Sequence, residues 1–269
     1  MHLNHYHRRS IKAGRNSQVF WATKPTGRII IFVHGFHGKS TGTWEEIPGL
    51  LSRAQEMNGT DIIYYGYNST RVRAHASAIK FGDFVDKLKD DSTQYMDPLI
   101  REQRKSTGTH DNSLVIVAHS LGALVARQAL LIGHKKTKEW IKSTKLILFA
   151  PADLGTNLAP VQIGRTLLTD LLFTMELFIE LCGPVMADVR EGSQFINDLR
   201  RESQRLVDQG VTSLLATAIF HAERELIVNQ GIFLRQEPAG DVFNRATHRS
   251  ICKPGSSYQE PLKKLLAAI

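Results

Sequence analysis

Five apolar runs of strand length, each separated from the next by helix-like sequence, constrain the fold of this chain most strongly. The runs are 28-RIIIFVHGF-36, 61-DIIYYGY-67, 113-SLVIVAH-119, 144-TKLILFA-150 and 213-SLLATAIF-220. The first run is continuously apolar rather than alternating, which is typical of a strand buried on both faces. Strands that alternate with helices predict a mostly parallel sheet with helices on both faces. We therefore expect an α/β fold.

The interval 156–209, between the last two runs, is longer than one crossover helix requires. In its most apolar part, 166–186, apolar side chains fall along one helical face. That part also contains three acidic residues at helical intervals, Asp170, Glu176 and Glu180, which argue against a transmembrane helix. The segment is then either a helix packed into the core, or a cap or lid that offers an apolar face to an acyl chain or a membrane.

No internal repeat and no segment of low complexity is visible in the 269 residues. With 42% hydrophobic and 22% charged residues, the composition is that of an ordinary globular protein. We expect one domain, 1–269, with a helical lid insertion at about 156–209. The sequence does not determine the oligomeric state.

The net charge of +8 favours contact with anionic surfaces. The charge is spread along the chain, and no compact basic stripe with interleaved aromatic residues is present, so a nucleic acid ranks last among the partners considered. The N-terminal sequence is basic but lacks the apolar core of a signal peptide. We therefore expect a cytoplasmic protein, with peripheral membrane contact through 166–186.

The cysteines and the N-terminal histidines do not indicate a metal site. Cys182 and Cys252 lie in different contexts without metal-ligand spacing, which favours free thiols in a reducing compartment. His2, His5 and His7 belong to a polar terminus that we expect to be frayed rather than to bind a metal. Neither a metal nor an organic cofactor is expected.

The stretch 118-AHSLG-122 places a serine directly after a predicted strand and at the start of a helical pattern. This is the context of a nucleophile elbow, in which small residues are needed two before and two after the serine, because the tight turn brings their backbones against its neighbours. Ala118 and Gly122 meet that need. The pattern predicts that Ser120 is a nucleophile rather than a small packing residue.

A nucleophilic serine also needs hydrogen-bond donors for the oxyanion that forms when it attacks. In this arrangement one backbone N–H comes from the residue after the serine and the other from the loop after an early strand. Leu121 supplies the first donor. In 33-VHGFHG-38, Gly35 allows a close backbone approach and Phe36 is placed to supply the second.

The general base should be a histidine that follows both the nucleophile and an acid in the chain. Beyond His119 the sequence has only His134, His221 and His248. The first falls at the end of the helix that the serine begins, and the second ends a predicted strand with no carboxylate loop between that strand and itself. The base is therefore predicted to be His248.

Three carboxylates are candidates for the acid that orients this histidine. Glu223 and Glu225 follow the last predicted strand, and Asp153 follows the strand before it, where some lipases place the acid. We favour Glu225, because an acidic residue three before a valine is frequent in such loops and Val228 stands at that spacing.

Taken together, these motifs resemble the α/β-hydrolase superfamily, and within it the GPI inositol-deacylase-like and serine-active-site-containing lipid hydrolases. The resemblance covers about residues 28–254 and rests on VHGFHG followed by Trp44, YYGYN, VAHSLG, FAPADLGTNLA, DVREGSQFINDL and above all THRSICKP. It implies an α/β-hydrolase fold and assigns the catalytic serine and histidine to Ser120 and His248. Ala118 and Ala152 depart from the glycine and histidine that are common in these relatives.

The expected function is that of a serine hydrolase that cleaves carboxylic esters, those of lipids in particular, through an acyl-enzyme on Ser120. A thioesterase or amidase would use the same machinery. The competing class is a receptor or signalling module that keeps the fold without the chemistry.

Overall fold

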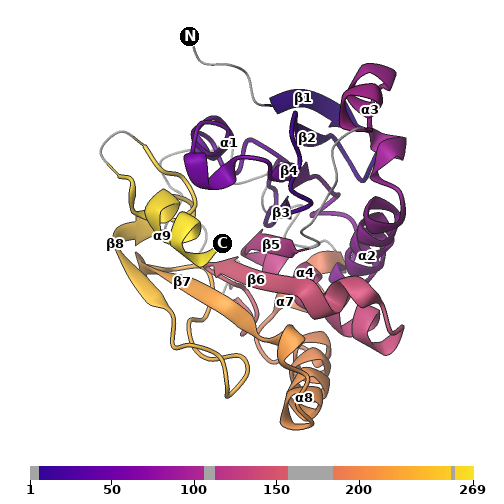
Figure 1. Cartoon of the computed structure of the whole chain (residues 1–269). Helices are drawn as coiled ribbons and strands as arrows, with labels where there is room; N and C mark the ends of the chain where they lie inside the picture. The colour runs from indigo at the N-terminus through magenta and orange to yellow at the C-terminus, as the bar shows by residue number, and fades with distance from the viewer. Residues whose placement is uncertain (1–5, 106–112, 157–183, 256–257) are drawn as a thin grey trace.

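The computed structural model describes residues 6–105, 113–156, 184–255 and 258–269, and its centre is an eight-stranded sheet (Figure 1). The strand order is β1-β2-β4-β3-β5-β6-β7-β8. Six strands run parallel, namely β3 (Ile29–Val33), β4 (Asp61–Tyr65), β5 (Leu114–His119), β6 (Thr144–Phe149), β7 (Ala216–Arg224) and β8 (Asp241–Thr247). The hairpin of β1 (Tyr6–Ile11) and β2 (Ser17–Ala22) extends the sheet antiparallel to β4. The predicted mostly parallel sheet is confirmed.

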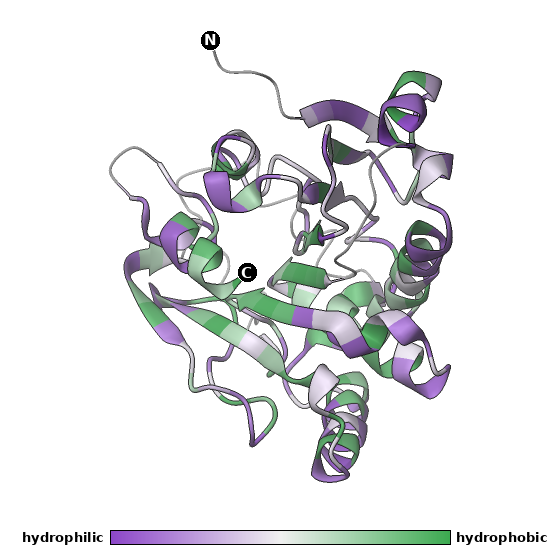
Figure 2. Cartoon of the chain, in the orientation of Figure 1, coloured by the Kyte–Doolittle hydropathy of each residue, from purple (hydrophilic) through white to green (hydrophobic). Residues whose placement is uncertain are grey.

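The apolar runs explain why the central strands lie where they do. All residues of β3, β4 and β5 are buried, as expected for strands covered on both faces. The register aligns Ile31 of β3 with Ile63 of β4 on one side and with Ile116 of β5 on the other. Hydropathy colouring shows the same central strands as predominantly hydrophobic (Figure 2).

Four elements differ from the sequence expectations, and one of them, the mostly buried strand β2, was not predicted. Residues 6–11 are not frayed but form the edge strand β1, where the His7 ring contacts the Gln103 side chain at 2.9 Å. The last predicted run begins with the short helix η4 (Thr212–Leu214) and continues as β7 four residues beyond its expected end. The edge strand β8 was not predicted, because its seven residues include only three apolar ones and it is exposed along most of its length.

Helices cover both faces of the sheet. On one face α2 (Ala74–Asp90) packs on α4 (Leu121–Lys135), and α4 packs on α8 (Gln194–Asp208), with the short α7 (Pro184–Val189) at its side. The other face carries α1 (Ile47–Leu51) and α9 (Glu260–Ala268), whose buried residues join the second core cluster. The remaining short helices are η1 (Gln55–Met57), η2 (Ser92–Tyr95), α3 (Pro98–Arg104) and η3 (Glu139–Ser143).

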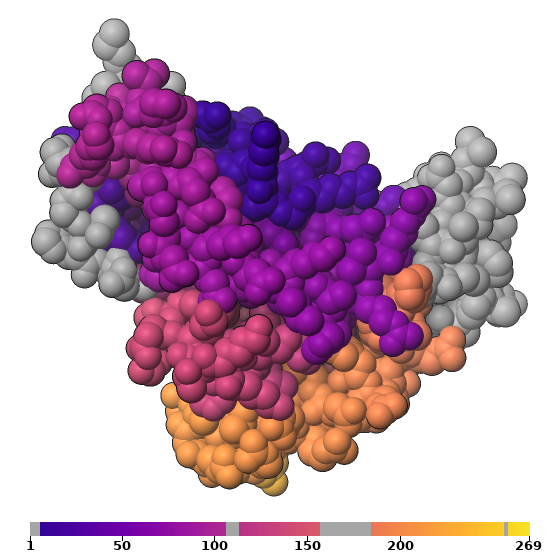
Figure 3. Space-filling model, turned by 90° about the vertical axis from the view of Figure 1, so that its right-hand side faces the viewer, coloured from indigo at the N-terminus to yellow at the C-terminus, as the bar shows by residue number. Residues whose placement is uncertain are grey.

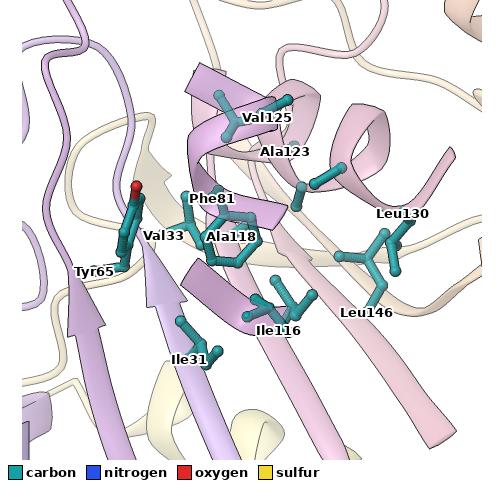
Figure 4. Close-up of a cluster of buried hydrophobic side chains, with 14 of the residues drawn as sticks. Ile31, Val33, Tyr65, Phe81, Ile116, Ala118, Ala123, Val125, Leu130 and Leu146 are labelled. Atoms are coloured by element: carbon teal, nitrogen blue, oxygen red, sulfur yellow. The ribbon is translucent and has the colours of Figure 1, made fainter. Parts of the chain in front are cut away.

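The larger core lies between the sheet and the layer of α2, α4 and α8. Figure 4 shows side chains of the central strands, among them Val33, Ile116 and Leu146, directed toward α4, where Ala123 and Val125 meet them. Figure 3 shows the flank on which the outer residues of α2 (purple) and α8 (orange) are exposed. No helix in the described parts of the chain is long and apolar enough to cross a bilayer.

The parallel strands place the predicted motifs at one edge of the sheet. The segments that follow β3, β5, β6, β7 and β8 all start from the carboxyl ends of their strands, and in an open parallel sheet this edge is where sites form. Because β3 pairs directly with β5, the segment after β3 lies next to the serine after β5.

Candidate active site

Ser120 occupies a tight turn between the last residue of β5 and the first residue of α4. Its backbone has φ 54° and ψ −123°, a conformation that a non-glycine residue adopts at a cost of about 1–3 kcal/mol. Gly122 explains why the turn needs small residues, since a Cβ there would lie 2.4 Å from the Val33 carbonyl oxygen. Ala118, which stands in place of the usual glycine, is fully buried and pairs with Val33.

The His248 ring lies between the serine and a carboxylate. Its Nε2 is 2.9 Å from Ser120 Oγ, and its Nδ1 is 2.9 Å from Glu225 Oε2. A carboxylate only accepts hydrogen bonds, so Nδ1 carries the proton and Nε2 is left to accept from the serine hydroxyl. The structure therefore joins Ser120, His248 and Glu225, three of the predicted site residues, in one chain of hydrogen bonds.

Glu225 is held in place by its own loop. Its other carboxylate oxygen accepts hydrogen bonds from the backbone N–H groups of Ile227 at 2.8 Å and Val228 at 3.1 Å. The Glu225 and His248 side chains are only 4% and 9% exposed. The valine three residues after the acid thus contributes a donor that fixes the carboxylate.

The two other candidate acids lie away from the base. Glu223 accepts a hydrogen bond from the backbone N–H of Arg245, at the exposed end of β7. Asp153 is buried and paired with Arg127 at 2.9 Å. The geometry favours Glu225 over both.

Arg127 joins two buried carboxylates behind the elbow. Besides Asp153, it contacts both oxygens of Glu237 at 2.7 and 3.0 Å, and all three side chains are at most 2% exposed. Glu237 also accepts from the backbone N–H groups of Ala216 and Leu234. This network ties α4 to the segments after β6 and β7, which gives Asp153 a structural role.

The predicted oxyanion donors flank Ser120. Leu121 is the first residue of α4, where a backbone N–H has no partner within the helix. The segment with Phe36 comes close on the other side, since a Cβ on Gly35 would lie 2.7 Å from Ser120 Cβ. Phe36 itself is partly buried against the larger core.

His34 holds the peptide unit that carries the Phe36 N–H. The Tyr67 N–H donates to His34 Nε2 at 3.2 Å, so the proton is on Nδ1, which donates to the Gly35 carbonyl at 2.8 Å. The Gly38 N–H donates to the same carbonyl at 3.1 Å. Because a trans peptide directs its N–H opposite to its C=O, these two bonds aim the Phe36 N–H away from His34. Burial lowers the pKa of His34 to about 4, which keeps the ring neutral.

Two histidines that contact the site were not predicted, His34 and His119. Each lies within a quoted motif, 33-VHGFHG-38 or 118-AHSLG-122, but a histidine that bonds to a backbone carbonyl leaves no spacing pattern in the sequence.

The predicted lid insertion, about 156–209, lies partly within the described residues. Residues 157–183, which include most of the apolar segment 166–186, lie outside the described residues. The described part of the insertion holds α7 and α8. Residue Asp188 of α7 caps α2, since the Ala74 N–H donates to its Oδ2 at 2.9 Å, and α8 packs on α4. In the described parts of the chain no group of His, Cys, Asp and Glu could hold a metal ion.

Comparison with known proteins gives both a family match and structural neighbours. Residues 23–156, just under half of the chain, match the family described as "Putative serine esterase (DUF676)". No curated protein sequence matches the chain. A Pyrobaculum calidifontis esterase is similar in structure with a TM-score of 0.58 at 12% identity, over 99% of this chain and 85% of that one.

Two further solved structures show the same similarity. The mature Bacillus licheniformis lipase BlEst2 has a TM-score of 0.57 at 12% identity, over 99% of both chains. The Saccharomyces cerevisiae peroxisomal alpha-beta-hydrolase Lpx1 has a TM-score of 0.54 at 13% identity, over 99% of this chain and 88% of that one. At such identities the likeness concerns the fold alone.

Proposed function

We propose that the chain is a serine ester hydrolase, which the match of residues 23–156 to a serine esterase family and the fold of the solved esterases and lipases support, and that it cleaves carboxylic esters, those of lipids in particular, through an acyl-enzyme on Ser120. One observation carries the assignment of residues. The Glu225 carboxylate, the His248 ring and the Ser120 hydroxyl form a continuous chain of hydrogen bonds of 2.9 Å each. The chain ends at a serine in a strained turn after a central strand.

The reaction follows from this order. His248 Nε2 takes the Ser120 proton as Oγ attacks the acyl carbon, and Glu225 stabilises the imidazolium without itself becoming protonated. The oxyanion lies between the N–H groups of Phe36 and Leu121. His248 then gives its proton to the departing alcohol oxygen, and the ester C–O bond breaks.

The acyl-enzyme is released by the same groups. Water loses a proton to His248 and adds to the acyl carbon, and the proton returns to Ser120 Oγ as the acid leaves. Each proton taken by the base is given back, so neither a metal nor an organic cofactor takes part.

The preference for lipid esters has two supports. The first is the resemblance to lipid hydrolases, together with the apolar segment 166–186, which we propose as a lid that contacts acyl chains or a membrane surface. The second is Leu226, the residue after Glu225, whose apolar side chain is 73% exposed. A cytoplasmic location stays a prediction.

The test is hydrolysis of a p-nitrophenyl ester series from butyrate to palmitate by the whole chain. We expect turnover by the wild type and a loss of roughly a thousandfold or more in Ser120→Ala. A lipid preference requires that kcat/KM rise with acyl length. Retained activity in Ser120→Ala would show that the nucleophile is wrong.

Fluorophosphonate labelling separates the enzyme from a receptor with the same fold. We expect the folded wild type to be labelled at Ser120 and Ser120→Ala to stay unlabelled. Absence of labelling in folded wild type would favour the receptor. Matched thioesters and amides of one acyl group define which bond is cleaved.

A further inference from the structure

His119 contacts the main chain of His248 on one side and the segment that carries the Phe36 N–H on the other. It is the last residue of β5 and directly precedes Ser120. Its ring lies 4.9 Å from the His248 ring, centre to centre, at an angle of 45°, and 6.4 Å from the Trp44 ring. The proposed mechanism gives this buried imidazole no chemical step.

One ring nitrogen of His119 bonds to the main chain of the base. Nε2 lies 2.9 Å from the His248 carbonyl oxygen. A carbonyl only accepts, so Nε2 carries the proton of the neutral ring. The bond joins segments from strands that are not neighbours in the sheet, because β6 and β7 lie between β5 and the strand β8 that leads to His248. The central strand thus holds the backbone of a residue delivered from the sheet edge.

The other ring nitrogen faces the segment that carries the Phe36 donor. Nδ1 is buried without a hydrogen-bond partner, and a Cβ on Gly35 would lie 3.1 Å from it. Burial lowers the pKa of His119 to about 3, with His248 as the second cause. The His119 ring therefore stays neutral, and it lies between His248 and the segment that carries the Phe36 N–H.

We propose that His119 is a positioning residue whose Nε2–H fixes the backbone of His248, so that the base stays in line with the Ser120 hydroxyl. The inference rests on the proposed function. Glu225 fixes the far end of the same histidine through the ring. With its main chain and its ring both held, His248 can place Nε2 at 2.9 Å from Ser120 Oγ without searching other rotamers.

A pair of variants of similar size tests the donor. In His119→Gln the side-chain amide N–H reaches about as far as imidazole Nε2, whereas in His119→Asn it stops near the position of Nδ1. We expect His119→Gln to keep kcat within about threefold of the wild type, and His119→Asn to lower it about ten- to a hundredfold, because a buried carbonyl loses its donor. KM should change by less than about twofold in both.

A spectroscopic signal distinguishes positioning from a general structural role. The His248 Nδ1 proton, which is bonded to Glu225, should give a low-field proton resonance that Glu225→Ala removes. We expect this resonance to persist in His119→Gln and to broaden or shift in His119→Asn.

The outcomes keep this inference apart from the proposed function. Full activity of Ser120→Ala overturns the function itself. If that variant is inactive while His119→Asn keeps the wild-type kcat and the low-field resonance, the His119 inference alone fails. It also fails if His119→Gln melts like the wild type but loses more than tenfold in kcat, and this comparison decides the matter even where His119→Asn does not fold.

Discussion

Replacing Glu225 by glutamine tests the acid more sharply than removing it. In the wild type one carboxylate oxygen accepts from the N–H groups of Ile227 and Val228, and the other accepts from His248. The single carbonyl oxygen of glutamine can accept either from the two backbone N–H groups or from His248, but not from both. Two backbone donors outweigh one, so the carbonyl should face the loop and the amide N–H₂ should face the imidazole.

That orientation reverses the tautomer of the base. An amide donor opposite Nδ1 requires a lone pair there and places the proton on Nε2, which then cannot accept from Ser120. The variant also loses the attraction between carboxylate and imidazolium in the transition state. With charge centres about 4 Å apart and an effective dielectric constant of about 20, this attraction is about 4 kcal/mol, or about a thousandfold in rate.

We therefore expect Glu225→Gln to lower kcat for a p-nitrophenyl ester by about a thousandfold, with KM and melting temperature close to those of the wild type. The matched control is Glu223→Gln, the same change two residues earlier at a carboxylate that bonds only to a backbone N–H. It should stay within about threefold of the wild type. If Glu225→Gln keeps more than a tenth of the wild-type activity, the acid is misassigned.

Three further predictions concern stability. Gly122→Val should unfold the protein at lower temperature and abolish activity, because its Cβ would meet the Val33 carbonyl oxygen at 2.4 Å; an unchanged melting temperature would refute the close approach. Arg127→Leu leaves two buried carboxylates without their cation and should cost about 3–5 kcal/mol in urea unfolding; a cost below about 1 kcal/mol would show that the network is dispensable. His34 and His119, whose pKa values burial lowers to about 4 and 3, bind protons more readily when unfolded, so stability should fall as the pH drops below about 6.5, by about 2 kcal/mol for each at pH 5. Urea unfolding at pH 7 and pH 5 checks this, and equal stabilities would contradict it.

The parts of the fold that the sequence predicted correctly are those set by local pattern. The runs at β3, β4, β5 and β6 are apolar on both faces, so burial could be read from composition alone. Edge strands carry no such signal, because their outer residues face water. This is why β1 and β8 were missed. The inner strand β7 was placed too early for another reason, because its apolar run begins in the short helix η4 and its last two residues are charged.

In the candidate site, too, the local features were predictable from the sequence and the long-range contacts were not. Ser120 and the small residues around it are neighbours in sequence, and the turn they form depends on local sterics, so the motif alone predicts the elbow. The pairing of that serine with His248, 128 residues later, depends on the segment after the edge strand β8, which reaches the serine at the end of the central strand β5. Chain order suggested the histidine, but the distance comes only from the fold.

The sequence by itself determined an α/β sheet, a serine at a strand-to-helix turn and a short set of partners for it, because hydrophobic periodicity and small flanking residues act over a few positions. Only the tertiary structure decided which of three carboxylates faces the base. Asp153 is turned to Arg127, and Glu225 to His248. The contact that His119 makes with the base likewise exists only in three dimensions, since a hydrogen bond to a backbone carbonyl imposes no residue type on its partner.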